Sequence, residues 1–171
     1  MEKMKKSLFI ALIVSGIYIT MQSVINGTGT VATLNIYGLD NLQVLPLHEL
    51  PLIKTLEINQ ATLEQPETHD LIFNLIHMHN VIDLHFHIFN IDTQNILFLA
   101  QGLRHKFHLK FLKFHGCETI DDIGSQAIFD ALQDSPKLEH LSLLNHKIST
   151  SQQKKLRTRM RKSHPNCSVY F

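Results

Sequence analysis

The sequence has little cysteine: only Cys117 and Cys167 among 171 residues. That is too few for a disulfide framework of the kind that holds small secreted domains together. In the repeat described below they fall two units apart, about 10 Å at roughly 5 Å per strand, beyond the ~7 Å limit for a bridge. We therefore expect two free thiols that act as small buried apolar residues, which leaves the redox compartment open.

The chain also lacks a strong net charge, which is +1, and only 18% of its residues are charged against 44% apolar. This balance favours one ordered domain with a sizeable core, and gives the whole molecule no general attraction to nucleic acid or membranes. The charges are unevenly distributed. Residues 40–83 hold seven acids and one base, Lys54, whereas the chain after His140 holds seven bases and no acid.

Catalytic motifs are absent as well. The sequence contains no glycine-rich phosphate loop, no G-x-S-x-G elbow and no H-E-x-x-H pair. Cys117 occupies a buried position of the repeat, which argues against a cysteine–histidine nucleophile. We expect no enzymatic activity and no cofactor.

What the chain does contain is a repeat. Its starting positions are 28, 28, 29 and 29 residues apart, at Ile53, Val81, Leu109, Leu138 and Cys167. The first four units read approximately L-x-x-L-x-L, a strand pattern, followed by apolar residues at helical spacing. Helix starts are predicted near Thr68, Thr93, Asp121 and Ser149, and Gln152 stands at capping-box distance from Ser149. Residues 165–171 are predicted to form a final strand.

The units resemble leucine-rich repeats of the ribonuclease-inhibitor-like subclass, with the pattern L-x-x-L-x-L-x-x-N/C-x-L. Leu109, Leu112, Phe114 and Cys117 fit this pattern, as do Leu138, Leu141, Leu143 and Ile148. The Asn/Cys position holds His146 in the unit that starts at Leu138, and Ala61 and Phe89 in the units that start at Ile53 and Val81, which predicts looser turns there. The resemblance covers residues 31–171. It implies an α/β solenoid, a right-handed βα superhelix with short parallel strands on a concave face and helices on a convex face.

Alternation along such strands turns the leucines inward and the residues between them onto the concave face. We expect this face to bind another protein, of unknown identity, and the chain to be a monomer. The candidate binding residues are Tyr37, Glu57, Asn59, Asp83, His85, His87, Phe111, Lys113, His115 and His140.

Histidines on neighbouring strands raise the question of a metal site. His85, His87 and His115 would lie close together with Asp83 nearby, but a flat sheet spreads its ligands and Lys113 adds a repelling charge. We expect no metal. A surface that responds to pH near the histidine pKa is a milder interpretation.

The last predicted helix is rich in cations. They surround the apolar pair Leu156 and Met160, and comprise Lys154, Lys155, Arg157, Arg159, Arg161 and Lys162. Such a run can dock on anionic lipid, or it can be the solvated face of a terminal unit. It has no interleaved aromatic residues for base stacking, so we expect no nucleic acid.

Residues 1–25 carry three lysines near their start, Lys3, Lys5 and Lys6, and continue with an uncharged apolar run over residues 7–25. This arrangement is typical of a secretion signal or a membrane anchor, and favours an exported or membrane-associated protein over a cytoplasmic one. The alternative is a degenerate N-terminal repeat, because Leu8, Ala11 and Ile13 copy the strand spacing.

The sequence thus predicts a non-enzymatic binding module, similar in general character to small repeat proteins that bacteria living inside host cells deliver as effectors. The alternative is a structural or assembly factor tethered at a membrane by residues 7–25, with its basic last helix against anionic lipid.

Overall fold

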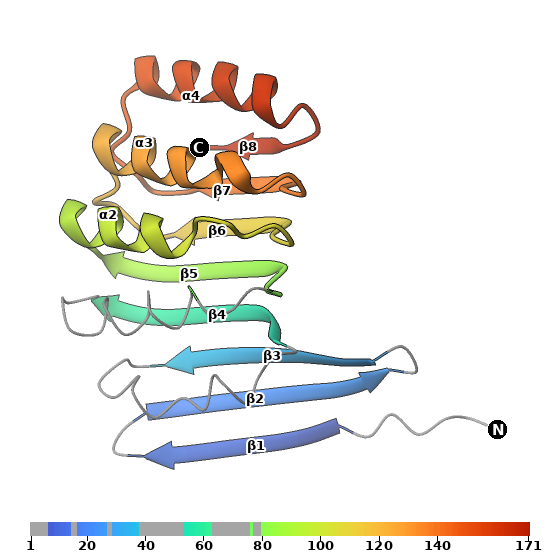
Figure 1. Cartoon of the computed structure of the whole chain (residues 1–171). Helices are drawn as coiled ribbons and strands as arrows, with labels where there is room; N and C mark the ends of the chain where they lie inside the picture. The colour runs from blue at the N-terminus through green and yellow to red at the C-terminus, as the bar shows by residue number, and fades with distance from the viewer. Residues whose placement is uncertain (1–6, 15–16, 27–28, 38–52, 63–75, 77–79) are drawn as a thin grey trace.

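The computed structural model of the chain describes residues 7–14, 17–26, 29–37, 53–62, 76 and 80–171. Its strands form one eight-stranded sheet in chain order (Figure 1). They are β1 (Ser7–Val14), β2 (Ile17–Asn26), β3 (Gly29–Tyr37), β4 (Ile53–Thr62), β5 (Asp83–Asn90), β6 (Phe111–His115), β7 (His140–Leu143) and β8 (Ser168–Tyr170). The helices are α2 (Thr93–Gly102), α3 (Asp122–Ala131) and α4 (Thr150–Ser163), with a 3-10 turn η3 (Leu132–Asp134). The α/β class predicted from the sequence is confirmed.

Strand direction divides the sheet into two parts. β1, β2 and β3 pair antiparallel, whereas every neighbouring pair from β3 to β8 is parallel. The apolar run over residues 7–25 falls in β1 and β2. In the part of the chain that the structure describes, no helix has both the length and the hydropathy to cross a bilayer. Export or anchoring by this segment stays a prediction.

Backbone hydrogen bonds reproduce the repeat interval. At the starts of successive strands the amide of Ile82 donates to Lys54, that of Lys110 to Ile82, that of Glu139 to Lys110 and that of Ser168 to Glu139. These donors lie 28, 28, 29 and 29 residues after their acceptors. The spacing of apolar residues in the sequence therefore corresponds to one strand per unit in the sheet.

The core lies between the parallel strands and the three helices, which cover one face of the sheet (Figure 1). Leu84, Leu112 and Leu141 are paired neighbours on β5, β6 and β7, and each is 0% exposed. Beside them the rings of Phe86 and Phe114 stack with centroids 4.8 Å apart. Each strand contributes one row to a continuous apolar layer, as expected of stacked units.

Helix starts agree with the sequence. Asp92, Asp121 and Ser149 cap α2, α3 and α4, each accepting a bond from a backbone amide three residues later. The start predicted near Thr68 lies outside the described residues.

The capping box differs from the prediction in one partner. The amide of Ser149 donates to the Asp122 carboxylate at 2.7 Å, and the Ser149 hydroxyl donates to the other oxygen at 2.7 Å. These bonds hold the pKa of Asp122 below its ordinary value. Gln152, the predicted partner, instead donates to the Asp122 carbonyl and to Gln126. The box is thus formed between consecutive units.

Replacing this cap provides a test. Ser149→Ala removes both the acceptor for the Gln152 amide and the donor to Asp122, so we expect the free energy of unfolding to fall by about 1 kcal/mol. Urea denaturation followed by circular dichroism measures the change. The matched control is Thr150→Ala, one residue into the helix, which leaves the cap in place. Equal losses in both variants would contradict the role of Ser149.

The turn after β7 corrects an expectation. We predicted a looser turn at His146, which stands where the repeat pattern has Asn or Cys. Instead, the His146 ring nitrogen Nδ1 accepts the amide of Ile148 at 3.1 Å, as an Asn side chain would. Burial lowers the pKa of this imidazole, which favours the neutral ring with its acceptor nitrogen. The side chains of Ala61 and Phe89 are outside the described part.

Both cysteines are free, as predicted, but they differ in burial. Cys117 is fully buried, and burial raises its pKa to about 12. Cys167 was also expected to be buried and is only half-buried, because it precedes β8, which no strand follows in the described sheet. Its pKa is raised to about 11. Both thiols therefore stay protonated near neutral pH, a form with little nucleophilicity.

Candidate functional site

The face of the sheet opposite the helices carries the predicted binding residues. We call it the open face and define it by the outward positions of β4, β5, β6 and β7. Their side chains are half-buried and alternate with fully buried ones along each strand. They comprise Thr55, Glu57, Asn59, Asp83, His85, His87, Phe111, Lys113, His115, His140 and Ser142.

The pairing register aligns these positions into rows across the strands. Glu57, His85 and Lys113 are successive partners, and so are Asn59, His87 and His115. The juxtaposition of His85 with Lys113 and of His87 with His115, predicted from the repeat, is confirmed. The backbone of Tyr37 pairs with Asn59, but its side chain is outside the described part.

Four basic side chains meet at the centre of the face, and we call His85, His87, Lys113 and His115 the His–Lys cluster. The rings of His87 and His115 meet edge to face, with centroids 5.1 Å apart. The rings of His85 and His87, on the same strand, lie 6.5 Å apart. The strands hold these groups, so little side-chain ordering is needed before a partner binds.

Two carboxylates partly offset the cluster. Asp83 Oδ1 lies 2.7 Å from His85 Nε2, and Glu57 Oε1 lies 3.6 Å from His87 Nε2. These contacts become ion pairs when the imidazoles are protonated. The first contact has the distance but not the angles of a hydrogen bond, and both its atoms are shielded from solvent. It is therefore an electrostatic contact that a small displacement would change.

Lys113 and His115 are not offset in this way. Among the residues that the structure describes, neither has a carboxylate within ion-pair distance. Burial and the positive neighbours His87, His85 and Lys113 lower the pKa of His115. Lys113 and His115 can therefore donate hydrogen bonds that no described carboxylate accepts. A carboxylate of a partner could accept them.

An aromatic pair adjoins the cluster. Phe111 and His140 are partners on β6 and β7, and their rings stack with centroids 5.1 Å apart and an angle of 10°. Phe111 and His140 are both half-buried, so the stacked pair presents a flat apolar surface beside the charged centre. Apolar anchors next to charged groups are typical of protein interfaces.

A metal centre finds no support in the described part of the chain: no three His, Cys, Asp or Glu side chains there converge on a point that could hold an ion. The pairwise contacts of the histidines are with each other's rings and with single carboxylates. The arrangement can donate hydrogen bonds and attract negative charge.

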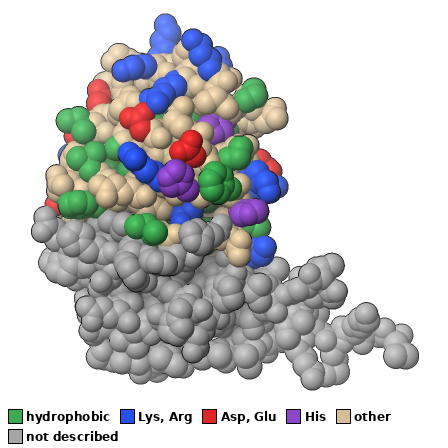
Figure 2. Space-filling view, in the orientation of Figure 1, with side chains coloured by type: hydrophobic (Ala, Val, Ile, Leu, Met, Phe, Trp, Pro, Cys, Tyr) green, Lys and Arg blue, Asp and Glu red, His purple; other side chains and the backbone are tan. Residues whose placement is uncertain are grey.

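The basic residues of α4 do not form one uniform patch. Arg159 forms an ion pair with Asp130 of α3 at 2.6 Å, and the Arg157 guanidinium lies 5.1 Å above the Phe171 ring. Lys155 lines a groove beside α3. The remaining members, Lys154, Arg161 and Lys162, are exposed. Lys and Arg side chains gather over this end of the molecule in Figure 2.

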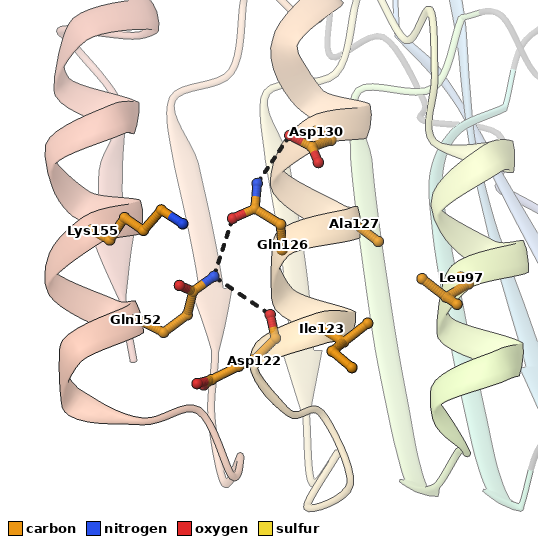
Figure 3. Close-up of a pocket in the computed structure, with 8 residues that line it drawn as sticks. All are labelled: Leu97, Asp122, Ile123, Gln126, Ala127, Asp130, Gln152 and Lys155. Carbon is orange, nitrogen blue, oxygen red and sulfur yellow. Dashed lines mark hydrogen bonds between the residues drawn. The ribbon is translucent and has the colours of Figure 1, made fainter.

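A groove of about 420 Å³ runs between α2, α3 and α4 (Figure 3). Its polar groups already bind one another: Gln152 donates to the carbonyl of Asp122 and to Gln126, which donates to Asp130. The groove therefore leaves few polar groups aimed at a ligand. Its apolar part consists of Leu97, Ile123 and Ala127, of which Ile123 is 63% exposed. We interpret the hydrogen bonds from Gln152 to Asp122 and to Gln126 as contacts that hold α3 and α4 together.

One unusual residue was missed in the sequence. Lys106 is 1% exposed, and burial lowers its pKa to about 8. Its position in the repeat could have indicated this, because it stands 29 residues before Ser135 and 58 before His164, which are also buried and polar.

Comparison with known proteins yields neither a matching protein-family model nor a curated protein with significant sequence similarity.

Proposed function

We propose that the protein is a non-enzymatic leucine-rich-repeat solenoid that binds a partner protein through its open face, the concave face of such a solenoid. Three observations support the repeat assignment: the parallel strands, the helices on one face, and backbone bonds recurring every 28 or 29 residues. The Cys117 and His146 turns occupy the positions that the repeat pattern reserves for side chains that bind the backbone.

One observation carries the binding proposal. The register of the sheet gathers Lys113 and His115, neither offset by a described carboxylate, beside the stacked pair of Phe111 and His140. A partner carboxylate bound at Lys113 would gain a charge-assisted hydrogen bond. An apolar partner side chain would cover the rings. Such a surface favours a partner segment that carries an acidic residue next to an apolar one.

The alternative of α4 lying against anionic lipid has weaker support. Arg159 is neutralised by Asp130, and Arg157 is held over Phe171. The cations left over are not accompanied by an exposed apolar stripe, because Leu156 and Met160 are both 0% exposed. Interfacial helices need an apolar face to insert into the bilayer.

The test reverses charge on the open face. The immobilised full chain and the double variant Lys113→Glu/His115→Glu are used to capture proteins from a lysate of the organism that encodes the chain, followed by quantitative mass spectrometry. We expect at least one protein to bind the unmodified chain and to be depleted about tenfold or more on the variant. Its purified form should then show the same difference in dissociation constant.

The control is Lys155→Glu, a single charge reversal on the helix side of the sheet. It should retain the captured protein, and the circular dichroism spectra and unfolding midpoints of all three proteins should agree. A partner that binds the double variant as well as the unmodified chain would refute the open face as the binding surface. If Lys155→Glu fails to capture the partner while the double variant still captures it, the binding site lies on the helices and not on the open face.

A further inference from the structure

The C-terminal end of the sheet is incompletely covered. Leu84, Leu112 and Leu141 are 0% exposed, whereas Val169, the partner of Leu141 on β8, is only half-buried. Cys167 is half-buried as well. Each internal strand is flanked by two others, but β8 is the last in the sheet order. Within the described sheet, β8 therefore has a neighbouring strand on one side only.

The free edge of β8 also has unused backbone groups. The amide of Ser168 donates to Glu139 and therefore faces β7. Because successive residues of a strand point their amides to opposite sides, the amide and carbonyl of Val169 face the free edge. Among the described residues, no strand pairs there. An edge of this kind is a template for one more strand.

Positive charge borders this edge. On the flank of α4 that faces α3, Lys155 lines the groove (Figure 3). Arg159 forms the ion pair with Asp130 of α3. Lys154, Arg157 and Arg161 are spaced by three and four residues and lie on the other flank of the helix. The contact of Arg157 with Phe171, one residue after β8, places that flank beside the last strand. All three are exposed, and no described carboxylate forms an ion pair with any of them.

We propose that this edge binds an extended acidic segment of a partner protein, which adds to β8 as a further parallel strand and so continues the parallel pairing of β7 with β8. Its backbone would bond Val169, its apolar side chains would cover Val169 and Cys167, and its carboxylates would meet Lys154, Arg157 and Arg161. The site is separate from the open face. A second copy of this chain is a poor occupant, because two β8 edges placed together would bring the two cationic rows into contact.

The test uses a defined probe, the fluorescein-labelled peptide acetyl-Asp-Glu-Val-Thr-Val-Glu-Asp-amide, whose two valines fall on one side of a strand. Fluorescence anisotropy at roughly 50 mM salt gives its dissociation constant for the full chain. We expect Lys154→Glu/Arg161→Glu to weaken binding about tenfold or more, and the single reversal Lys155→Glu on the opposite flank to change it less than about threefold.

Strand addition has its own signature. A peptide with proline in place of the central threonine has the same charge but cannot complete the ladder, so we expect its binding to weaken about tenfold or more. Hydrogen exchange of the Val169 amide, followed by NMR, should slow about tenfold or more when the threonine peptide is saturating. Circular dichroism confirms that the charge variants are folded.

Each contrary result would overturn the proposal. Equal binding of the proline peptide would show simple attraction between a polyanion and α4. Binding to phosphatidylserine vesicles without binding to the peptide would assign the cations to lipid. Sedimentation that shows a dimer in which the Val169 amide is already protected would make a second copy the occupant. If the threonine peptide does not bind even at millimolar concentration, the edge of β8 does not bind acidic segments and the proposal is wrong.

Discussion

Leu112→Ala is expected to lower the free energy of unfolding by about 2–5 kcal/mol. Leu112 is 0% exposed and lies between Leu84 and Leu141 in the middle of the apolar layer. Truncation would leave a cavity that these neighbours, themselves fixed in the sheet, can fill only in part. Urea denaturation followed by circular dichroism measures the loss.

The matched comparison is Lys113→Ala, the next residue along β6. Its side chain is on the open face, so we expect a change within about 0.5 kcal/mol. The same variant should weaken any partner that binds the His–Lys cluster. A large loss of stability with Lys113→Ala and none with Leu112→Ala would invert the assignment of inner and outer faces on which the proposed function depends.

The sequence predicts the register of the sheet well, for a physical reason. Backbone pairing between parallel strands is uniform, so a constant interval between units determines which residue lies beside which. The juxtapositions of His85 with Lys113 and of His87 with His115 follow from that interval and the two-residue period of a strand alone. Local caps were also predictable, because Asp121 and Ser149 act on amides only three residues away.

Side-chain partners between units were less predictable. The carboxylate of Asp122 bonds to Ser149, 27 residues later, and replaces the expected contribution of Gln152. The α4 cations looked equivalent in the sequence, yet among the described residues only Arg159 forms an ion pair, with Asp130. Such contacts depend on which rotamer reaches which neighbour across two helices, and a repeat interval does not specify rotamers.

The partial exposure of Cys167 and Val169 at the end of the sheet was also not predictable from the sequence. Cys167 and Val169 occupy positions that are buried in every earlier described unit, such as Leu138 and Leu141. Leu138 and Leu141 are three residues apart, whereas Cys167 and Val169 are two apart. The last pair is more exposed because no strand follows β8 in the described sheet. The repeat therefore predicts the identity of inward positions, whereas burial depends on having a neighbour on both sides.

Lys106 shows how a polar residue is accommodated before a strand. The carbonyls of Lys106, Ser135 and His164 accept the amides of Leu109, Leu138 and Cys167, respectively, in equivalent turns. His164 Nε2 lies 3.1 Å from the carbonyl of Ser135 and joins successive turns. These side chains therefore stand in one buried column, in which a charged ammonium loses much of its hydration.

We expect the stability of the unmodified chain, relative to Lys106→Met, to increase with pH above about 8. Burial lowers the pKa of Lys106 to about 8 from the ordinary 10.5. Below pH 8 both folded and unfolded chains carry the charge, and the folded state bears the full desolvation penalty. Between these two pKa values only the unfolded chain is protonated, so stability rises with pH.

The size of the effect follows from the shift. From about pH 7 to about pH 9.5 the difference in unfolding free energy between the two proteins should change by on the order of 2 kcal/mol in favour of the unmodified chain. Urea denaturation at both pH values measures it, and the comparison cancels the titration of groups that the proteins share. Methionine preserves the approximate length of the side chain, so the packing term stays constant with pH. A difference that does not change with pH would mean that burial does not destabilise the Lys106 ammonium in the folded chain.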